Sequence, residues 1–174
     1  MKNFFRKVAF GLKPDEQIPS DPLTWAQKQI ETVPELNWKG KYILSEKEMR
    51  EHWIKQRVEE NTTLRKKFKN DPQGLKKAEK LLEYETGRQF WKSNEICMRH
   101  AEGIRSNTPV LAKLWYFWTN HFTISDTQSL ASFSTGAYQR EFIRANMDKK
   151  FETMAIEATI AWPMMMHLDN KDNV

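Results

Sequence analysis

The chain has 174 residues, of which 39% are hydrophobic and 29% are charged, and its formal net charge is +5. A chain of this length allows one domain, and its single cysteine, Cys97, excludes an internal disulfide and a cysteine-based zinc site. No segment approaches the roughly 20 apolar residues of a membrane span. Glycine is scarce and Lys, Glu, Ala, Met and Leu are frequent, a composition that favours helices. We therefore expect an all-α fold without a sheet, a single irregular helical domain over residues 1–174 with about six or seven helices.

The beginning of the sequence predicts two short helices separated by a loop. Residues 1–10 place apolar side chains on one helical face, and three prolines then interrupt the chain. A second helix is expected after Asp21, with Pro22 in its first turn. The opening stretch has no uninterrupted apolar run of about 7–15 residues such as an export signal contains. The default prediction is therefore a cytoplasmic protein.

Two capping signals mark the starts of the next helices. Ser45 and Glu48 have the spacing of a capping box, in which each side chain accepts a hydrogen bond from the backbone N–H of the other residue. Asp71 followed by Pro72 is typical of an N-cap and a first helical residue. These signals predict helices that begin near residues 45 and 72.

Residues 61–80 hold seven Lys or Arg and two acidic residues, and the difference of +5 equals the net charge of the chain. Such a cluster can bind nucleic acid or another anionic surface. The stretch lacks the interleaved aromatic side chains that stack on bases, and a run of this kind is more typical of a solvated helix face. Anion or nucleic-acid binding through basic residues 65–80 is kept as a second alternative function.

The aromatic stretch LWYFWTNHFTIS, residues 114–125, predicts a central helix. Thr108 is expected to cap a helix over residues 109–122 that begins with Pro109. At about 100° per residue, His121 falls inside the apolar arc of this helix and Asn120 on its polar edge. A histidine in such a position is typically a buried neutral imidazole, although functional histidines also occupy partly dry pockets.

Two further helices, 136–146 and 148–162, are expected to pack against 109–122. Arg140 and Arg144 flank the first, and Asp148 is expected to cap the second. Pro163 should end or kink that helix. The three methionines that follow, residues 164–166, indicate adaptable core filler or a docking surface. Residues 171–174 are expected to form a frayed tail.

The sequence contains no sharp catalytic, metal-binding or cofactor-binding motif, and its four histidines lack metal-ligand spacing. We predict no metal and no cofactor. Two polar clusters end apolar helical segments, one at Asn120 and His121 and one at His167, Asp169 and Asn170. If the two clusters met, His121 and Asp169 could transfer a proton or bind a divalent metal. In the simpler interpretation, Asp169 and Asn170 form a turn and cap the next element.

These same motifs resemble the bacterial domain-of-unknown-function 1800 family. The residues that carry the resemblance are Phe117, Trp118, Asn120, His121 and Phe122, then Tyr138, Ile143 and Arg144, then Phe151, and finally Met164, Leu168, Asp169 and Asn170. The best match covers residues 107–170. The chain departs from the family at Lys149, where the family usually has glycine, and at residues 162–164, where it usually reads Pro-Ala-Met.

The resemblance implies a mainly helical fold, frequent export from the cell and frequent pairing with a second uncharacterised bacterial family, but no established reaction. Family members commonly continue well past the Leu-Asp-Asn motif. The resemblance therefore implies that the chain is the N-terminal part of a longer domain, either truncated or a fragment.

The sequence leaves open whether the protein is an enzyme. The leading hypothesis is a non-catalytic, incomplete helical protein that docks to a protein partner through a Met/Trp-rich surface. The alternative is a hydrolase-like enzyme or its remnant, with His121 and Asp169 as catalytic candidates. The binding candidates are Asn120, Arg140, Arg144 and Asn170.

Overall fold

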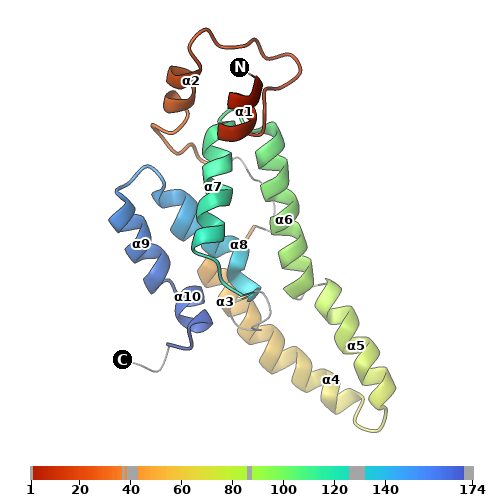
Figure 1. Ribbon diagram of the computed structural model, residues 1–174. Helices are drawn as coiled ribbons and strands as arrows, with labels where there is room; N and C mark the ends of the chain where they lie inside the picture. Colours follow the sequence, from red (N-terminus) through yellow and green to blue (C-terminus); the bar gives the residue numbers. More distant parts are fainter. Residues whose placement is uncertain (1, 37, 39–42, 86–87, 126–131, 171–174) are drawn as a thin grey trace. The chain divides into compact units, whose positions relative to one another are not determined.

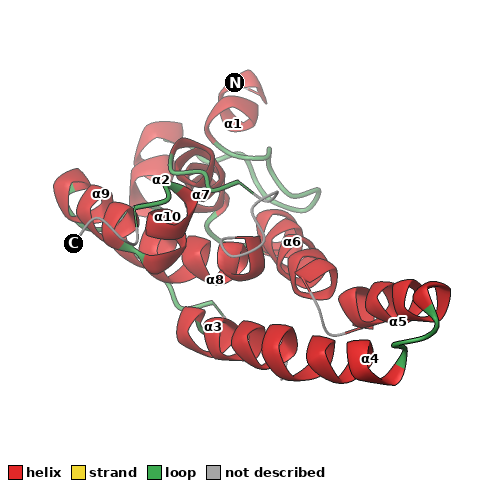
Figure 2. Ribbon diagram, turned by 90° about the horizontal axis from the view of Figure 1, so that it is seen from below, coloured by secondary structure: helices red, strands yellow, loops and turns green. Residues whose placement is uncertain are grey.

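The structure is a computed structural model that describes residues 2–36, 38, 43–85, 88–125 and 132–170 (Figure 1). Every regular element among these residues is a helix, as Figure 2 shows. The predicted all-α fold without a sheet is therefore confirmed for the described part of the chain. The tail predicted to fray, residues 171–174, lies outside the described residues.

The described helices follow one another along the chain in a fixed order. They are α1 (Lys2–Val8), α2 (Pro22–Lys28), α3 (Glu46–Lys55), a π-helical segment (Gln56–Glu60), α4 (Asn61–Lys67), α5 (Pro72–Glu85), α6 (Arg88–Arg105), α7 (Pro109–His121), a 3-10 turn (Ser132–Ser134), α8 (Thr135–Tyr138), a second π-helical segment (Gln139–Ile143), a second 3-10 turn (Arg144–Asn146), α9 (Phe151–Ile160) and α10 (Trp162–His167).

The chain divides into two compact units. Unit 1 comprises Met1–Trp38, Cys97–Thr123 and Gln139–Ala161, and unit 2 comprises Lys39–Ile96, Ile124–Tyr138 and Trp162–Val174. Each unit thus combines three stretches that are distant in the sequence. A single domain over residues 1–174 stays a prediction.

Helix α7 forms the centre of unit 1. Its side chains Leu111 and Trp115 are almost fully buried, as are Phe5 of α1 and Ile143 of the second π-helical segment. Helix α7 contacts this π-helical segment, and α9 contacts both that segment and the following 3-10 turn. The predicted packing of the central helix against 136–146 is therefore confirmed, and its contact with the predicted helix 148–162 is made at Phe151, whose ring centroid lies 5.5 Å from that of Trp118.

The start of α7 is capped by a residue that the sequence analysis did not single out. Thr108 occupies the N-cap position, but its side chain makes no capping hydrogen bond. Instead, the buried side chain of Gln29, just after α2, accepts a hydrogen bond from the backbone N–H of Val110 at 3.0 Å. The expected cap by Thr108 is wrong because a residue 81 positions away supplies the acceptor.

After α8 the chain continues as a π-helical segment over Gln139–Ile143 and then as a 3-10 turn over Arg144–Asn146. The indole N–H of Trp115 donates to the carbonyl of Gln139, the first residue of the π-helical segment, at 2.9 Å. A side chain that inserts into the backbone ladder is a known cause of such irregularity. The predicted regular helix over 136–146 is therefore replaced by three short pieces.

Helix α9 begins three residues later than expected. Its N-cap is Lys150, without a side-chain hydrogen bond, so the predicted cap by Asp148 is wrong. Asp148 lies inside a turn in which the backbone N–H of Lys149 donates to the carbonyl of Asn146. At the other end, α9 stops at Ile160 and α10 begins at Trp162, with Pro163 in its first turn. The predicted break at this proline is confirmed.

Unit 2 has a small core between α3, α6, α8 and the first 3-10 turn. Its buried members are Met49, Trp91, Phe133 and Ala137. The predicted capping box starts α3: Glu48 accepts from the Ser45 backbone N–H at 2.8 Å, and the Ser45 hydroxyl accepts from the Glu48 backbone N–H at 3.3 Å.

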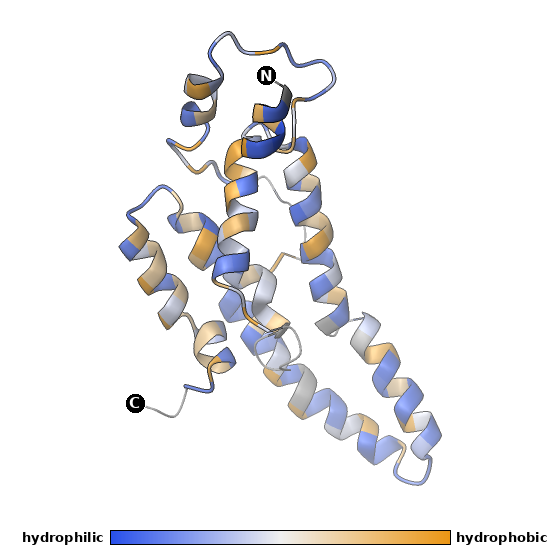
Figure 3. Ribbon diagram, viewed as in Figure 1, coloured by the Kyte–Doolittle hydropathy of each residue, from blue (hydrophilic) through white to orange (hydrophobic). Residues whose placement is uncertain are grey.

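Helices α4 and α5 form an antiparallel hairpin in unit 2, as the views in Figures 1 and 2 agree. The predicted N-cap of α5 is confirmed, because Asp71 accepts a hydrogen bond from the backbone N–H of Gly74 at 2.9 Å. None of the described side chains of α4 or α5 is buried. Figure 3 shows that hydrophilic residues dominate both sides of the tip of this hairpin.

Candidate functional site

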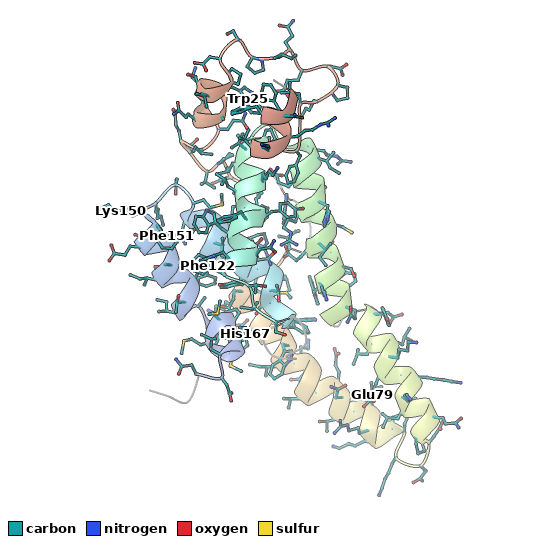
Figure 4. The ribbon with its side chains drawn as sticks, viewed as in Figure 1. Trp25, Glu79, Phe122, Lys150, Phe151 and His167 are labelled. Atoms are coloured by element: carbon teal, nitrogen blue, oxygen red, sulfur yellow. The ribbon has the colours of Figure 1, made fainter. Side chains whose placement is uncertain are left out.

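An aromatic cluster surrounds the C-terminal end of α7 in unit 1. It consists of Phe117, Trp118, His121 and Phe122 of the α7 end together with Phe151 of α9. The rings of Trp118 and Phe151 have centroids 5.5 Å apart, and those of His121 and Phe122 lie 5.0 Å apart. Figure 4 shows Phe122 and Phe151 side by side. We call these five residues the α7 aromatic cluster.

His121 is exposed, so the prediction of a buried imidazole is wrong. The buried side chains of α7 are centred on Trp115, which lies at about 140° when Val110 is set at 0°, whereas His121 lies at about 20°. Phe117, on the same side as His121, is 55% exposed. Aromatic content made this side resemble the core face, but α7 turns it outward.

The surroundings of His121 are aromatic rather than acidic. In the described part of unit 1 its interactions are ring contacts, and the nearly parallel ring of Phe117 lies 6.2 Å away between centroids. As the last residue of α7, a protonated imidazole would interact favourably with the negative end of the helix dipole. Asn120 is exposed beside it, which agrees with the predicted polar edge.

Arg144, a predicted binding residue, is buried in unit 1, with 6% of its surface exposed. Its guanidinium donates to the carbonyl of Pro34 at 2.7 Å and lies 5.6 Å from the ring centroid of Trp115. Burial lowers the pKa of Arg144, and the negative charge of Glu102 offsets part of this shift. These contacts hold the loop after α2 against α7, a structural role that the sequence did not reveal.

Arg140 lies in the second π-helical segment and is half-buried. Its guanidinium is 3.8 Å from the carboxylate of the neighbouring Glu141. The described contacts therefore pair Arg140 within its own segment. Its role as a binding residue stays a prediction.

Asp169 and Asn170 end α10 in unit 2. The backbone N–H of Asn170 donates to the carbonyl of Met165 at 2.9 Å, and that of Asp169 donates to Met166 at 3.4 Å. Asp169 has a φ of 54°, in the left-handed region. This is the hydrogen-bond pattern of a Schellman C-cap, so the two residues form the predicted turn.

The two residues of the predicted catalytic pocket lie in different units, His121 in unit 1 and Asp169 in unit 2. Within unit 2, the nearby His167 accepts a hydrogen bond at Nδ1 from the backbone N–H of Ser125 at 3.2 Å. The hydrolase-like pairing stays a prediction.

The methionines expected to form a docking surface are largely covered. Met164 and Met166 are each 8% exposed, and Met165 is half-buried. Adaptable core filler, the other predicted role, fits this burial. The methionine part of the predicted Met/Trp surface is therefore wrong.

An exposed apolar stripe, which the sequence analysis did not predict, lies on α9. Ile156 and Ile160 are four residues apart and 52% and 60% exposed. At about 100° per residue, Glu152 and Glu157 fall on the two sides of this stripe. The four-residue spacing of the two isoleucines is the signal in the sequence that indicates this stripe. We call Ile156 and Ile160 the α9 stripe.

The basic residues of 65–80 lie on the α4–α5 hairpin in unit 2. Arg65 is 3.8 Å from Glu79 across the hairpin, so part of this charge is balanced within the chain. The lysines of this stretch are exposed. Anion binding by this region stays a prediction.

Among the described residues, no group of three or more His, Cys, Asp or Glu side chains is arranged to hold a metal ion. Cys97 is exposed and makes no disulfide. None of the helices in the described ranges combines the length and apolar character needed to cross a membrane.

Comparison with known proteins gives one result. The sequence model of the family described as "Protein of unknown function (DUF1800)" matches residues 3–174. No curated protein and no solved structure matches the chain. The match includes the α7 aromatic cluster, Arg144 and the Leu-Asp-Asn turn at the end of α10. The chain therefore belongs to the DUF1800 family of proteins of unknown function.

Proposed function

We propose that this DUF1800 chain is a non-catalytic helical protein that docks to another protein through the α9 stripe. The observation that carries this proposal is the exposure of Ile156 and Ile160, each more than half exposed. Exposed apolar side chains grouped on one face of a helix typically mark an interaction surface.

The composition of α9 supports the same conclusion. Its ten residues, FETMAIEATI, include only two charged side chains, Glu152 and Glu157. A helix that is apolar on most sides is normally covered on most sides. In unit 1 its inner face is covered at Met154 and Ala158, whereas the stripe remains open to solvent.

The charges beside the stripe define the chemistry of the partner. Because Glu152 and Glu157 bracket the isoleucines, a complementary segment would be an amphipathic helix whose apolar stripe is flanked by Lys or Arg. The proposed partner is therefore a protein with a basic amphipathic helix.

Site-specific photo-crosslinking tests this proposal. A photoreactive amino acid at position 160, in cells that express the protein, should form a covalent product with one partner, which mass spectrometry identifies. The same amino acid at the exposed position 66 in unit 2 is the control and should not give that product. Absence of a product specific to position 160 would overturn the proposal.

Substitutions then test the identified partner in purified form. Ile156→Glu combined with Ile160→Glu should weaken binding at least about tenfold in calorimetry, because it places charges in the centre of the contact. Ile104→Glu is the matched control, since Ile104 is an isoleucine of unit 1 that is 75% exposed. Binding that tolerates the stripe substitutions would contradict the proposal.

A further inference from the structure

The α4–α5 hairpin of unit 2 carries an apolar groove of about 520 Å³ with an acidic rim. Its apolar wall includes Leu64, Leu81 and Leu82, and its rim includes Glu59, Glu60 and Glu85. Leu81 is 57% exposed, and Tyr84, on the same side of α5, is 60% exposed. A hairpin with large apolar side chains open to solvent needs a second apolar surface to cover them.

The exposed face of α5 is complementary to itself. Lys77 lies four residues before Leu81, and Glu85 lies four residues after it. Each is therefore about 40° around the helix axis from Leu81, one on either side, so all three share one face of α5. A two-fold axis at Leu81 would turn one α5 antiparallel to another. It would place Lys77 of each copy against Glu85 of the other, with Leu81 packed on Leu81 between the two pairs.

The small and large apolar residues of this face follow the same symmetry. Ala78 lies three residues before Leu81 and Tyr84 three residues after it. In an antiparallel pair, the Tyr84 ring of one copy would occupy the layer in which Ala78 of the other leaves space. Both the charged and the apolar positions thus match under a single rotation.

The charge distribution of the hairpin also favours a second copy over an unrelated partner. The stretch 61–80 has seven basic and two acidic residues, whereas the groove is rimmed by three glutamates. An antiparallel pair brings Lys77 of one hairpin toward Glu85 at the acidic rim of the other, whereas a parallel pair would oppose like charges. The hairpin therefore contains the complement of its own groove.

We propose that two copies of this chain associate through their α4–α5 hairpins, antiparallel about a two-fold axis at Leu81, to form a four-helix arrangement. The inference is independent of the proposed docking through the α9 stripe, because the two surfaces lie in different units.

Sedimentation equilibrium of the full chain over a range of concentrations tests the proposal. The wild-type chain should form a reversible dimer. Leu81→Glu should raise the dimer dissociation constant at least about tenfold, because it buries like charges at the two-fold axis. Since Leu81 is mostly exposed, circular dichroism should show unchanged helix content. Ile104→Glu, at an exposed position of unit 1, is the matched control and should leave the dimer intact.

A charge swap tests the antiparallel register directly. Lys77→Glu alone and Glu85→Lys alone should each weaken self-association, because each places like charges opposite one another. An equimolar mixture of the two single variants should form a heterodimer, since every facing pair is then of opposite charge. The double variant Lys77→Glu/Glu85→Lys should again self-associate.

Several outcomes would overturn the inference. A wild-type chain that stays monomeric at every concentration would do so, as would a dimer that tolerates Leu81→Glu. A mixture of the two single variants that fails to associate would exclude this register. Binding of the groove to a protein of another sequence, with a monomeric wild-type chain, would assign the hairpin to a different partner.

Discussion

The centre of unit 1 and the α4–α5 hairpin of unit 2 show different kinds of contact. In unit 1, polar side chains connect segments that are far apart in the sequence: Lys113 donates to the carbonyls of Arg6 and Ala9, and Arg144 donates to Pro34. On the hairpin and α3 of unit 2, capping hydrogen bonds join residues within one turn, as between Ser45 and Glu48 or Asp71 and Gly74.

This difference is reflected in how deeply the apolar side chains of α7 and α5 are buried. Helix α7, which packs against distant segments, buries apolar side chains such as Leu111 and Trp115 in the interior of unit 1. A segment held by caps and neighbouring turns can keep apolar side chains outside, as α5 does with Leu81. Long-range ties are therefore expected to make unit 1 sensitive to substitution and the hairpin tolerant of it.

The largest expected effect compares one residue type in the two units. Ile143→Ala in unit 1 should lower the free energy of unfolding by about 2–5 kcal/mol, because its side chain is fully buried. Ile54→Ala in unit 2, where the side chain is 50% exposed, should change it by less than about 0.5 kcal/mol. Urea denaturation followed by tryptophan fluorescence measures both. Equal losses would show that Ile143 is not buried more deeply than Ile54.

Arg144 tests the long-range ties of unit 1. Arg144→Ala should cost about 1.5–3 kcal/mol, because it removes a charged hydrogen bond to Pro34 and the packing on Trp115. Hydrogen exchange should accelerate at Glu35 and Leu36, next to the released carbonyl. Arg105→Ala, at an exposed position of the same unit, is the control. Unchanged exchange at residues 35 and 36 would mean that the contact does not hold the loop.

Gly136 tests whether unit 2 also has a position at which a small substitution lowers the stability of the fold. A Cβ atom at Gly136 would lie 2.2 Å from Cγ and 2.5 Å from Cβ of Glu95. Glycine to alanine in a helix normally gains about 1 kcal/mol, but this overlap should make Gly136→Ala destabilising by about 1–3 kcal/mol. Thermal unfolding measures the change. Adding Glu95→Ala should recover part of it, and strict additivity of the two substitutions would contradict the predicted overlap.

Local signals of the sequence predicted the helix starts well. The capping box at Ser45 and Glu48, the cap at Asp71 and the start at Pro109 all depend on residues within one turn, and each is where the sequence placed it. The composition was likewise sufficient for an all-α fold. Predictions of this kind need no knowledge of which segments meet.

The failures arose where a distant residue decides the outcome. The side chain of Gln29 caps α7 in place of Thr108. The indole of Trp115 donates a hydrogen bond to the carbonyl of Gln139, where the regular helix is interrupted. Burial of α7 also depends on its neighbours, so the aromatic side that holds His121 could not be assigned as inner or outer from periodicity alone. For the same reason, the candidate His121 could be named from the sequence but its exposure could not.

A smaller effect concerns the turn that ends α10. Asp169 adopts a left-handed backbone conformation, which costs a residue with a side chain about 1–2 kcal/mol relative to glycine. Asp169→Gly should therefore stabilise unit 2 by up to about 1 kcal/mol, reduced by the greater flexibility of glycine in the unfolded chain. Asp169→Val should destabilise it, because branching at Cβ disfavours this conformation further. Thermal unfolding distinguishes the two, and a loss of stability with glycine would point to a role for the carboxylate itself.

The smallest effect is the pH dependence of the cap on α2 in unit 1. The Asp21 carboxylate accepts hydrogen bonds from the Thr24 hydroxyl at 2.6 Å and from the backbone N–H groups of Thr24 and Leu23, and these bonds lower its pKa. Because the pKa is lower in the folded chain, the stabilisation is present above the ordinary aspartate value and is lost as the pH falls through the folded value. The sign follows from proton binding, since the unfolded chain takes up the proton first.

Asp21→Asn isolates this contribution. The amide oxygen keeps an acceptor at the N-cap but does not titrate, so the difference in unfolding free energy between wild type and variant should shrink as the solution is acidified from neutral pH. Denaturation curves at several pH values give this difference directly. If the difference stays constant, the cap does not depend on the charge. In that case α2 would be held mainly by the long-range contact of Gln29 with Val110, which would make unit 1 still more dependent on distant ties than its hydrogen bonds already indicate.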